Sequence, residues 1–236
     1  MINSVEILRP GIYSSVQDLR RIGYKKYGIP SSGPMDEYSH ILVNWVLGKN
    51  IFSETIEITF FGPKIKMNFA CNIAIYGSSC EAYLNQESIK PGVSIPVEEG
   101  DVIDIQKCID GNRVYLAFSA KMKIDSSFDS VSTYDKIEIG GVSGKKLSKG
   151  DIILFEKIKI IRKRKIPQIF NRRYDQSNII RIIEGFHFNR IENISDIENK
   201  AFKISNDSDR MAVRLCGNKI KLHNKEEIES TVVNRG

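Results

Sequence analysis

The 236-residue sequence predicts a mainly β protein, built as a barrel or a sandwich and containing one clear helix. Most of the chain consists of short runs rich in β-branched and aromatic residues, which Gly, Pro, Asn or Asp separate at close spacing. Only one segment shows the apolar period of a helix. Many short strands combined with few helices are typical of barrels and sandwiches.

The predicted strands follow one another closely along the chain. In chain order they are 57–61, 64–69, 72–76, 93–97, 102–105, 114–118 and 152 onward, then 179–183 and 201–205, with 219–223 as a further candidate. Gly100 and Gly150 lie in matching turns that each start a strand. Asp110–Asn112 has the composition of a hairpin turn, because its central Gly tolerates the positive φ of tight turns.

The helix is predicted over residues 34–47. Ser32 is suited to cap its N-terminus, and Pro34 fits the first turn, where its missing N–H group is no loss. Asp36 complements the helix dipole in that turn, and Gly48 is a natural end. The predicted buried face follows three- and four-residue steps and consists of Met35, Tyr38, Ile41, Leu42, Trp45 and Val46.

The composition along the chain predicts two units and a connector. Residues 1–156 form the first unit, the basic stretch 157–177 with Pro167 suits a linker, and residues 178–236 form the second unit. The second unit has about 60 residues, which is small for an independent core.

Charge and cysteine content exclude several classes of protein. The net charge of +6 invites nucleic-acid binding, but much of the excess lies in the basic stretch, which we interpret as a solvated connector. No apolar run reaches the ~20 residues of a membrane helix, and the first ten residues do not resemble a signal peptide. The four cysteines show neither Cys-x-x-Cys nor zinc-ligand spacing. We therefore expect a cytoplasmic protein with reduced thiols, no nucleic-acid partner and no membrane partner.

Two neighbouring segments carry a family signature. Val16–Gly23 reads VQDLRRIG, and Gly28–Asp36 reads GIPSSGPMD. This closely resembles Gln-Asp-x-Gly-Arg-x-Gly followed by Gly-Val-Pro-x-Ser-Gly-Ala-Met-Asp, the pattern of the carboxyltransferase-like family that contains the C component of 5-oxoprolinase, KipA and allophanate hydrolase subunit 2. Further matches follow in the family's order: Glu57 with Gly62–Pro63, Ser130–Thr133, Gly140–Gly141, Gly144–Leu147, Gly150–Asp151 and Asp209–Gly217.

The sequence departs from the family pattern at several places. Arg20 stands where the family has Gly, Pro34 replaces Ala, and Ala212 replaces Gly. Members of the family continue for several dozen residues beyond the point that corresponds to Gly236. The chain is therefore expected to lack the family's C-terminal segment.

The resemblance implies a fold and an activity. The fold would be two cyclophilin-like β-barrel units, the second of them incomplete. The activity would be that of a hydrolase acting on a cyclic amide: the C-like component of an ATP-dependent 5-oxoprolinase, which opens 5-oxo-L-proline to L-glutamate together with the A and B components. The alternatives are a carboxyltransferase or allophanate hydrolase subunit 2 of urea metabolism, and a non-catalytic, KipA-like regulatory binding protein.

The matching positions supply candidate site residues. Asp18, Arg21 and Asp36 are the catalytic candidates: Arg21 as a charge clamp, and either aspartate as a base or a magnesium ligand. Each has a structural alternative, because Asp18 and Arg21 can form a buried ion pair and Asp36 can be a helix-start charge. The substrate-binding candidates are Gln17, Ser32, Gly33, Ser130, Ser132, Thr133, Gly140, Gly141 and Arg210.

The predicted cofactor is ATP, with Mg²⁺ as its optional companion. The chain lacks the Gly-x-x-x-x-Gly-Lys-Ser/Thr loop, so the ATP site would be of another type. Lys121 and Lys123 flank a methionine, which inverts the order of a biotin acceptor. We therefore expect no covalently attached biotin.

Overall fold

The computed structural model describes residues 2–156, 163–171, 180, 182–185, 187–210 and 212–224. The chain divides into two compact units, Met1–Asp175 and Gln176–Gly236. Of the basic linker predicted at 157–177, only residues 163–171 belong to the described part. Among the described residues, no helix combines the length and apolar character that crossing a bilayer requires.

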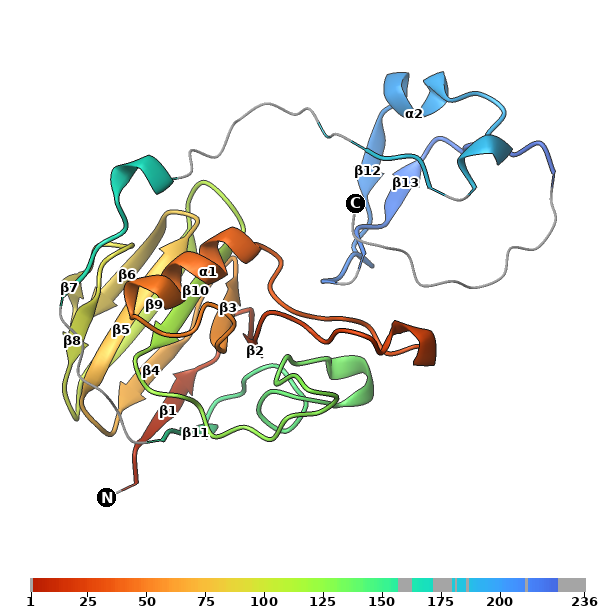
Figure 1. Cartoon of the computed structure of the whole chain (residues 1–236). Helices are drawn as coiled ribbons and strands as arrows, with labels where there is room; N and C mark the ends of the chain where they lie inside the picture. Colours follow the sequence, from red (N-terminus) through yellow and green to blue (C-terminus); the bar gives the residue numbers. More distant parts are fainter. Residues whose placement is uncertain are drawn as a thin grey trace. The chain divides into compact units, whose positions relative to one another are not determined.

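The first unit consists mainly of short strands (Figure 1). They are β1 (Ser4–Arg9), β2 (Tyr13–Gln17), β3 (Thr55–Thr59), β4 (Lys64–Met67), β5 (Cys71–Gly77), β6 (Cys80–Leu84), β7 (Glu87–Ser88), β8 (Ile95–Val97), β9 (Val102–Cys108), β10 (Arg113–Phe118) and β11 (Ile152–Leu154). The helix α1 spans Glu37–Val46, and short 3₁₀ turns occur at Lys25–Tyr27, Asp135–Ile137 and Gln168–Phe170.

These strands form two antiparallel sheets. The larger sheet has the order β11-β1-β4-β9-β6-β7, and the smaller has the order β2-β3-β10-β5-β8. The mainly β prediction is confirmed. Among the described residues the two sheets are open and do not close into a barrel: β11 and β7 are the edge strands of the larger sheet, and β2 and β8 are those of the smaller. The consecutive strands β9 and β10 belong to different sheets.

The predicted hairpin turn at Asp110–Asn112 is therefore wrong, because this turn links the two sheets. The Asp110 carboxylate fixes it by accepting hydrogen bonds from the Ser79 backbone N–H at 2.7 Å and the Ser79 hydroxyl at 2.6 Å. The two glycine turns that start strands are confirmed, since Gly100 and Gly150 have φ values of 93° and 88° before β9 and β11.

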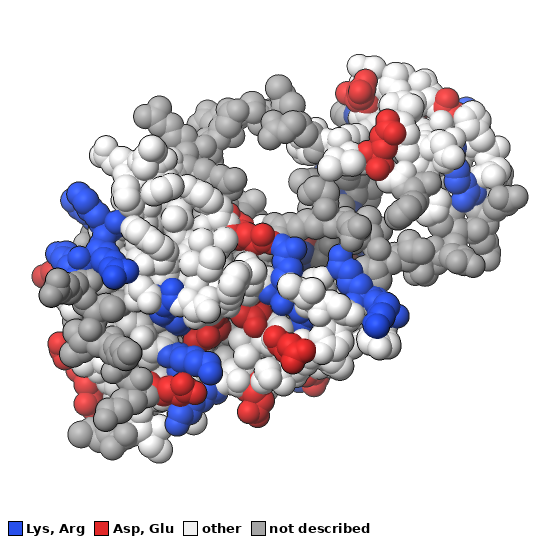
Figure 2. Space-filling model, viewed as in Figure 1, with Lys and Arg blue, Asp and Glu red and all other residues white. Residues whose placement is uncertain are grey.

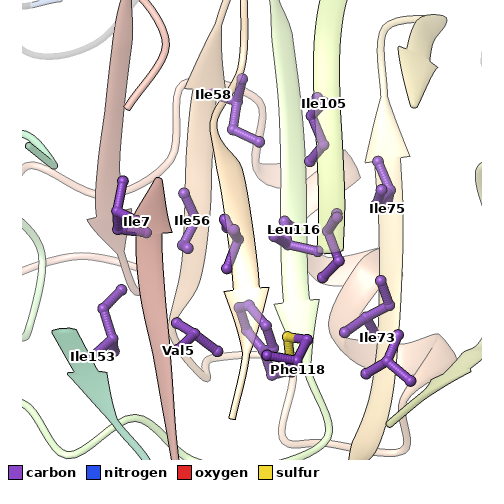
Figure 3. Packing of buried hydrophobic residues seen from close by; sticks show 14 of the residues in the cluster. Val5, Ile7, Ile56, Ile58, Ile73, Ile75, Ile105, Leu116, Phe118 and Ile153 are labelled. Carbon is purple, nitrogen blue, oxygen red and sulfur yellow. The ribbon is translucent and has the colours of Figure 1, made fainter. Parts of the chain in front are cut away.

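The main core lies between the two sheets. Figure 3 shows aliphatic and aromatic side chains from several strands pointing toward one another, among them Ile7, Ile56 and Leu116. Strand alternation explains this packing: Val114, Leu116 and Phe118 come from one face of β10 and belong to this cluster.

The helix α1 covers the outer face of the smaller sheet, where it forms a second apolar cluster. That cluster contains Leu42, Val43, Val46, Leu47, Ala74, Tyr76, Tyr115, Ala117 and Ile166. As a result, both faces of β3 are covered and all five of its residues are buried.

The predicted helix was correct in place, wrong in its start and wrong in part of its buried face. The helix begins at Glu37, and Asp36 rather than Ser32 is the N-cap, with its carboxylate accepting a hydrogen bond from the Ser39 N–H. The predicted core residues Met35 and Trp45 are 39% and 41% exposed. Leu42 and Val46 are buried as predicted. Ser39, His40, Val43 and Asn44 are buried as well, because the N-terminal half of the helix faces a polar part of the sheet.

The second unit contains short elements. They are a 3₁₀ turn at Phe188–Arg190, α2 (Ser195–Asn199), β12 (Phe202–Ile204) and β13 (Leu215–Gly217). The strand predicted at 201–205 is confirmed by β12. The strand predicted at 219–223 is wrong, because only Leu222 forms a bridge there; β13 pairs with β12 instead. Of the strand predicted at 179–183, residues 179 and 181 lie outside the described part, and the other three form no strand.

Candidate functional site

Polar side chains gather on the outer face of the smaller sheet, beneath the N-terminal half of α1. Cross-strand pairing places Ser15 of β2 opposite Glu57 of β3, and Glu57 opposite Tyr115 of β10. Gln17 pairs with Thr55 in a second row. All five residues are fully buried. Buried polar groups are costly unless they are hydrogen-bonded, so the partners of these residues define what this region can do.

Asp18, at the end of β2, holds the loop at residues 130–133. Its carboxylate accepts hydrogen bonds from the Ser130 hydroxyl at 2.5 Å, the Val131 N–H at 2.8 Å and the Ser132 hydroxyl at 2.6 Å. Three donors leave this carboxylate well satisfied. The geometry therefore gives Asp18 a positioning role rather than that of an open base.

The same loop continues along the edge of β2. The Thr133 N–H and hydroxyl donate to the Val16 carbonyl at 2.9 Å and 3.0 Å. The Gln17 amide donates through Nε2 to the Ser15 hydroxyl at 3.0 Å and to the Thr133 carbonyl at 3.3 Å. The loop thus protects the sheet edge and brings the predicted residues Gln17, Ser132 and Thr133 together.

Arg21 is almost completely buried, with 1% of its surface exposed. Its Nε donates to the Ser127 carbonyl at 3.0 Å, and its Nη2 donates to the Ser132 carbonyl. Burial lowers the pKa of the guanidinium, and the negative charge of Asp18 opposes this effect. Arg21 therefore forms hydrogen bonds with the backbone at Ser127 and Ser132. The negative charge of Asp18 raises the pKa of the guanidinium but does not outweigh burial.

Gly140 and Gly141 allow the loop that contains them to lie close to the loop at residues 130–133. Gly140 has φ 65°, and a Cβ there would lie 2.2 Å from the Ser132 carbonyl oxygen and 2.8 Å from Arg21 Nη2. Gly141 has φ 53°, and a Cβ there would lie 2.0 Å from the Thr133 hydroxyl. Any side chain at either position would displace the loop, so these predicted residues shape the site through close backbone approach.

The Ser31–Gly33 turn packs against the segment at residues 19–21. The Arg21 N–H donates to the Ser31 carbonyl at 2.7 Å, and a Cβ at Gly33 would lie 2.1 Å from the Leu19 carbonyl oxygen. Ser32 has φ 51°. The turn therefore lies beside Arg21, but it does not open a helix, because α1 starts only at Glu37.

Asp36 links this turn to the sheet. Its carboxylate accepts from the Ser39 hydroxyl at 2.6 Å and from the Ser39 N–H at 3.2 Å. Its backbone N–H donates to the Tyr115 hydroxyl at 2.8 Å. The predicted alternative, a charge at the helix start, therefore describes what Asp36 does in the fold.

Glu57, Tyr115 and His40 form a buried network that the sequence did not reveal as a site. Glu57 Oε2 accepts from the Tyr115 hydroxyl at 2.8 Å and from the Met35 N–H at 2.7 Å. Burial, reinforced by the charge of Glu57, raises the pKa of Tyr115 well above its usual value. His40 Nδ1 lies 3.0 Å from the Thr55 hydroxyl, and burial lowers its pKa to about 4, so the ring is neutral at pH 7.

One signal in the sequence could have pointed to this network. Thr55, Glu57 and Thr59 alternate with two isoleucines, which is the pattern of a strand with one polar face. A glutamate on a strand face that a helix covers must lie inside the protein. The strand pattern alone does not show that the helix covers this strand, and this contact is what buries Glu57.

Arg210 belongs to the second unit, where it is half-buried. The first unit contains all other predicted site residues. Within the described part of the chain, no group of three or more His, Cys, Asp or Glu side chains is placed to hold a metal ion. The four cysteines are free thiols.

Comparisons with known proteins connect this geometry to a family. The family described as "Carboxyltransferase domain, subdomain A and B" matches residues 27–236. The urea amidolyase of Saccharomyces cerevisiae is 31% identical over 230 residues, which cover 92% of this chain and 12% of the relative. The C component of the Escherichia coli 5-oxoprolinase is 26% identical over 230 residues, which cover 96% of this chain and 73% of the relative.

A solved structure shows the same fold. The crystal structure of the Kluyveromyces lactis urea carboxylase is 29% identical, with a TM-score of 0.81, and the match covers 94% of this chain and 21% of that one. The chain therefore spans a small part of the urea-metabolising relatives and a much larger share of the 5-oxoprolinase component.

Proposed function

The chain belongs to the family of carboxyltransferase domains, subdomains A and B, and from this membership we propose that it is the C-like component of an ATP-dependent 5-oxoprolinase. In this role it acts with a B-like and an A-like protein of the same enzyme to open 5-oxo-L-proline to L-glutamate. The observation that carries the proposal is the match to the C component of the Escherichia coli enzyme over 96% of this chain and 73% of the relative.

The chemistry of this reaction calls for buried positive charge and fixed hydrogen-bond donors. A lactam is a poor electrophile, and transfer of a phosphoryl group from ATP to its carbonyl oxygen makes the carbonyl carbon more electrophilic. Water adds to that carbon, and the C–N bond breaks as the ring nitrogen leaves with a proton. A second water hydrolyses the resulting acyl phosphate to glutamate and phosphate. Negative charge develops on the oxygens of the transferred group, and cations and oriented donors stabilise it. ATP is a substrate of this reaction, and Mg²⁺ would accompany it.

We assign roles to the predicted residues on this basis. Arg21 supplies positive charge beside the substrate carbonyl, because its guanidinium is buried and fixed by two carbonyl groups. Asp18 positions the loop that holds Arg21. Asp36 stays a proposed acid–base candidate; it is half-buried, as Asp18 is, and its carboxylate is held by Ser39. No step is assigned to Arg210, which belongs to the second unit.

A second candidate function is carboxyl transfer in urea metabolism. It is favoured by the higher identity to the urea amidolyase of Saccharomyces cerevisiae, 31%, compared with 26% for the 5-oxoprolinase component. It requires a carboxybiotin supplied by another domain or another protein. The two candidates share one requirement, which is a site for a small planar amide.

Reconstitution separates the two functions. The full chain, mixed with the A-like and B-like proteins, is expected to hydrolyse ATP only when 5-oxo-L-proline is present and to release glutamate. Arg21→Lys should lower kcat/KM at least about tenfold, because lysine does not reproduce the fixed guanidinium fork. Arg9→Lys is the matched control, since Arg9 pairs with Asp104 on the other sheet at 2.6 Å. No turnover in the complete mixture, together with urea-dependent decarboxylation of carboxybiotin, would establish the second function instead.

A further inference from the structure

Three buried polar atoms near the end of β2 have no hydrogen-bond partner among the described residues. They are Gln17 Oε1, Arg21 Nη1 and Ser32 Oγ. Gln17 and Arg21 are 0% and 1% exposed. A buried donor or acceptor without a partner costs about 1–3 kcal/mol, so a group of such atoms in one place needs an explanation.

The three atoms belong to one small region of the first unit. Gln17 Nε2 and Arg21 Nη2 donate to two consecutive carbonyls, those of Thr133 and Ser132. The Arg21 N–H donates to the carbonyl of Ser31, the residue next to Ser32. The same short loops therefore hold all three side chains.

Each of the two longer side chains has a fixed orientation. Gln17 Nε2 already donates to Ser15 and Thr133, which leaves Oε1 as an acceptor. Arg21 already uses Nε and Nη2, which leaves Nη1 as a donor. A Cβ at Gly140 would lie 2.8 Å from Arg21 Nη2, so the absence of a side chain there leaves room for the guanidinium. The site thus offers one buried acceptor and one buried donor in preset positions.

We propose that this acceptor and this donor bind the edge of a planar cis amide. The N–H of the ligand donates to Gln17 Oε1, and its carbonyl oxygen accepts from Arg21 Nη1 and from the Ser32 hydroxyl. A lactam ring and a urea molecule both present N–H and C=O on one edge, whereas a trans peptide does not. The inference rests on the proposed function and deepens it, because it names the atoms that select the substrate.

Neighbouring residues of this site are half-buried rather than fully buried. Asp18, Ser32 and Gly141 are all partly exposed. A small ligand that enters here replaces no existing hydrogen bond of Gln17 or Arg21, because their other atoms are already paired. Its binding energy therefore comes from hydrogen bonds to atoms that are already buried. Such bonds distinguish one ligand from another better than the amount of buried surface does.

The test compares ligands that differ in one atom. Binding of 5-oxo-L-proline, urea, L-proline and 5-oxotetrahydrofuran-2-carboxylate, in which a ring oxygen replaces the N–H, is measured by titration calorimetry on the full chain assembled with its proposed partners. The lactam is expected to bind at least about tenfold more tightly than the lactone, because the lactone leaves Gln17 Oε1 unpaired. L-Proline, which lacks the carbonyl, should bind at least as weakly as the lactone. Tighter binding of the lactam favours the 5-oxoprolinase function, and tighter binding of urea favours carboxyl transfer in urea metabolism.

Variants test whether Gln17 causes the preference for the lactam over the lactone. Gln17→Leu should bind lactam and lactone equally, and Gln17→Glu, which keeps an acceptor, should still prefer the lactam. Gln106→Leu, on the other sheet, is the matched control and should leave the preference unchanged. Thermal unfolding of each variant shows that it is folded.

The outcomes separate the inference from the function on which it rests. Equal binding of lactam and lactone by the unmodified protein, or a preference that survives in folded Gln17→Leu, overturns the inference. ATP turnover without that preference leaves the proposed function standing. A Gln17-dependent lactam preference without any ATP turnover supports the amide site and overturns the proposed function. Failure of both the lactam and urea to bind overturns both.

Discussion

The two units of this chain differ in how they use their apolar residues. All residues that are buried in the described part of the chain lie between Ser4 and Ile166, in the first unit. In the second unit, Ile182, Ile183 and Leu215 are 65%, 80% and 59% exposed. The lesson is that apolar content alone does not form a core. A core needs strands whose apolar faces meet those of another layer.

The first unit contains a second contrast, between the two faces of its smaller sheet. The inner face packs apolar side chains against the larger sheet, while the outer face carries Gln17, Glu57 and Tyr115 beneath α1. On the surface in view in Figure 2, positive and negative side chains are interspersed. The candidate site therefore stands out by its buried polar groups rather than by a charged surface.

The largest predicted change in the free energy of unfolding is for shortening a side chain in the core of the first unit. Phe118→Ala should lower the free energy of unfolding by about 3–5 kcal/mol, because Phe118 is fully buried and its ring centroid lies 4.9 Å from that of Phe155. Leu215→Ala should change it by less than about 0.5 kcal/mol, since Leu215 is exposed. Trp45 fluorescence during urea unfolding reports the first unit, and far-UV circular dichroism of the full chain reports both units. A comparable loss in both variants would contradict the comparison.

The next effect concerns pH and the buried His40. Its pKa is lowered to about 4 by burial, against the opposing charges of Asp18 and Glu57, while an unfolded histidine has a pKa of about 6.5. The neutral ring is therefore favoured by folding. The contribution of His40 to the free energy of unfolding is fully present above about pH 6.5. It falls by about 3 kcal/mol in total as the pH drops toward 4, because the unfolded histidine binds a proton that the folded one does not.

The measurement is the pH dependence of the urea midpoint for the unmodified protein and His40→Gln. The variant should lose this part of the slope between pH 6.5 and 4. His187→Gln, which alters an exposed histidine of the second unit, is the control. Identical slopes in the unmodified protein and His40→Gln would show that His40 is not buried in neutral form.

The smallest effect tests the polar face itself. Tyr115→Phe removes the hydroxyl that accepts from the Asp36 N–H and donates to Glu57, and it should cost about 1–2 kcal/mol. Tyr83→Phe, on the larger sheet, is the matched control and should cost less than about 0.5 kcal/mol. Equal costs would mean that the Tyr115 hydroxyl does not tie the start of α1 to the sheet.

The sequence predicted the strands well because their cause is local. Runs such as Val114–Phe118 contain β-branched and aromatic residues in a strand-length block, and the structure makes β10 there. The start of α1 was misplaced for a tertiary reason. Asp36 caps the helix, and the Met35 N–H just before it donates to Glu57, 22 positions away in the sequence, which fixes where the helix starts. Propensity at Ser32 and Pro34 could not reveal that contact.

The site was predicted in part because its residues occur in a recognisable motif. The structure brings Gln17, Asp18 and Arg21 together with Ser132 and Thr133, although 111 to 116 positions separate the bonded residues. Local sequence rules do not predict such pairs. The network of Glu57, Tyr115 and His40 was missed, because its members lie on three different elements and only Glu57 stands in a family motif.

Backbone hydrogen exchange of the full chain, measured in complex with its proposed partner proteins with and without 5-oxo-L-proline, tests the central claim most directly. The account predicts slower exchange at residues 17–36 and 127–141 when the lactam is present, and unchanged exchange in β12 and β13. Slowing confined to β12 and β13, or equal slowing by the lactone analogue, would contradict it.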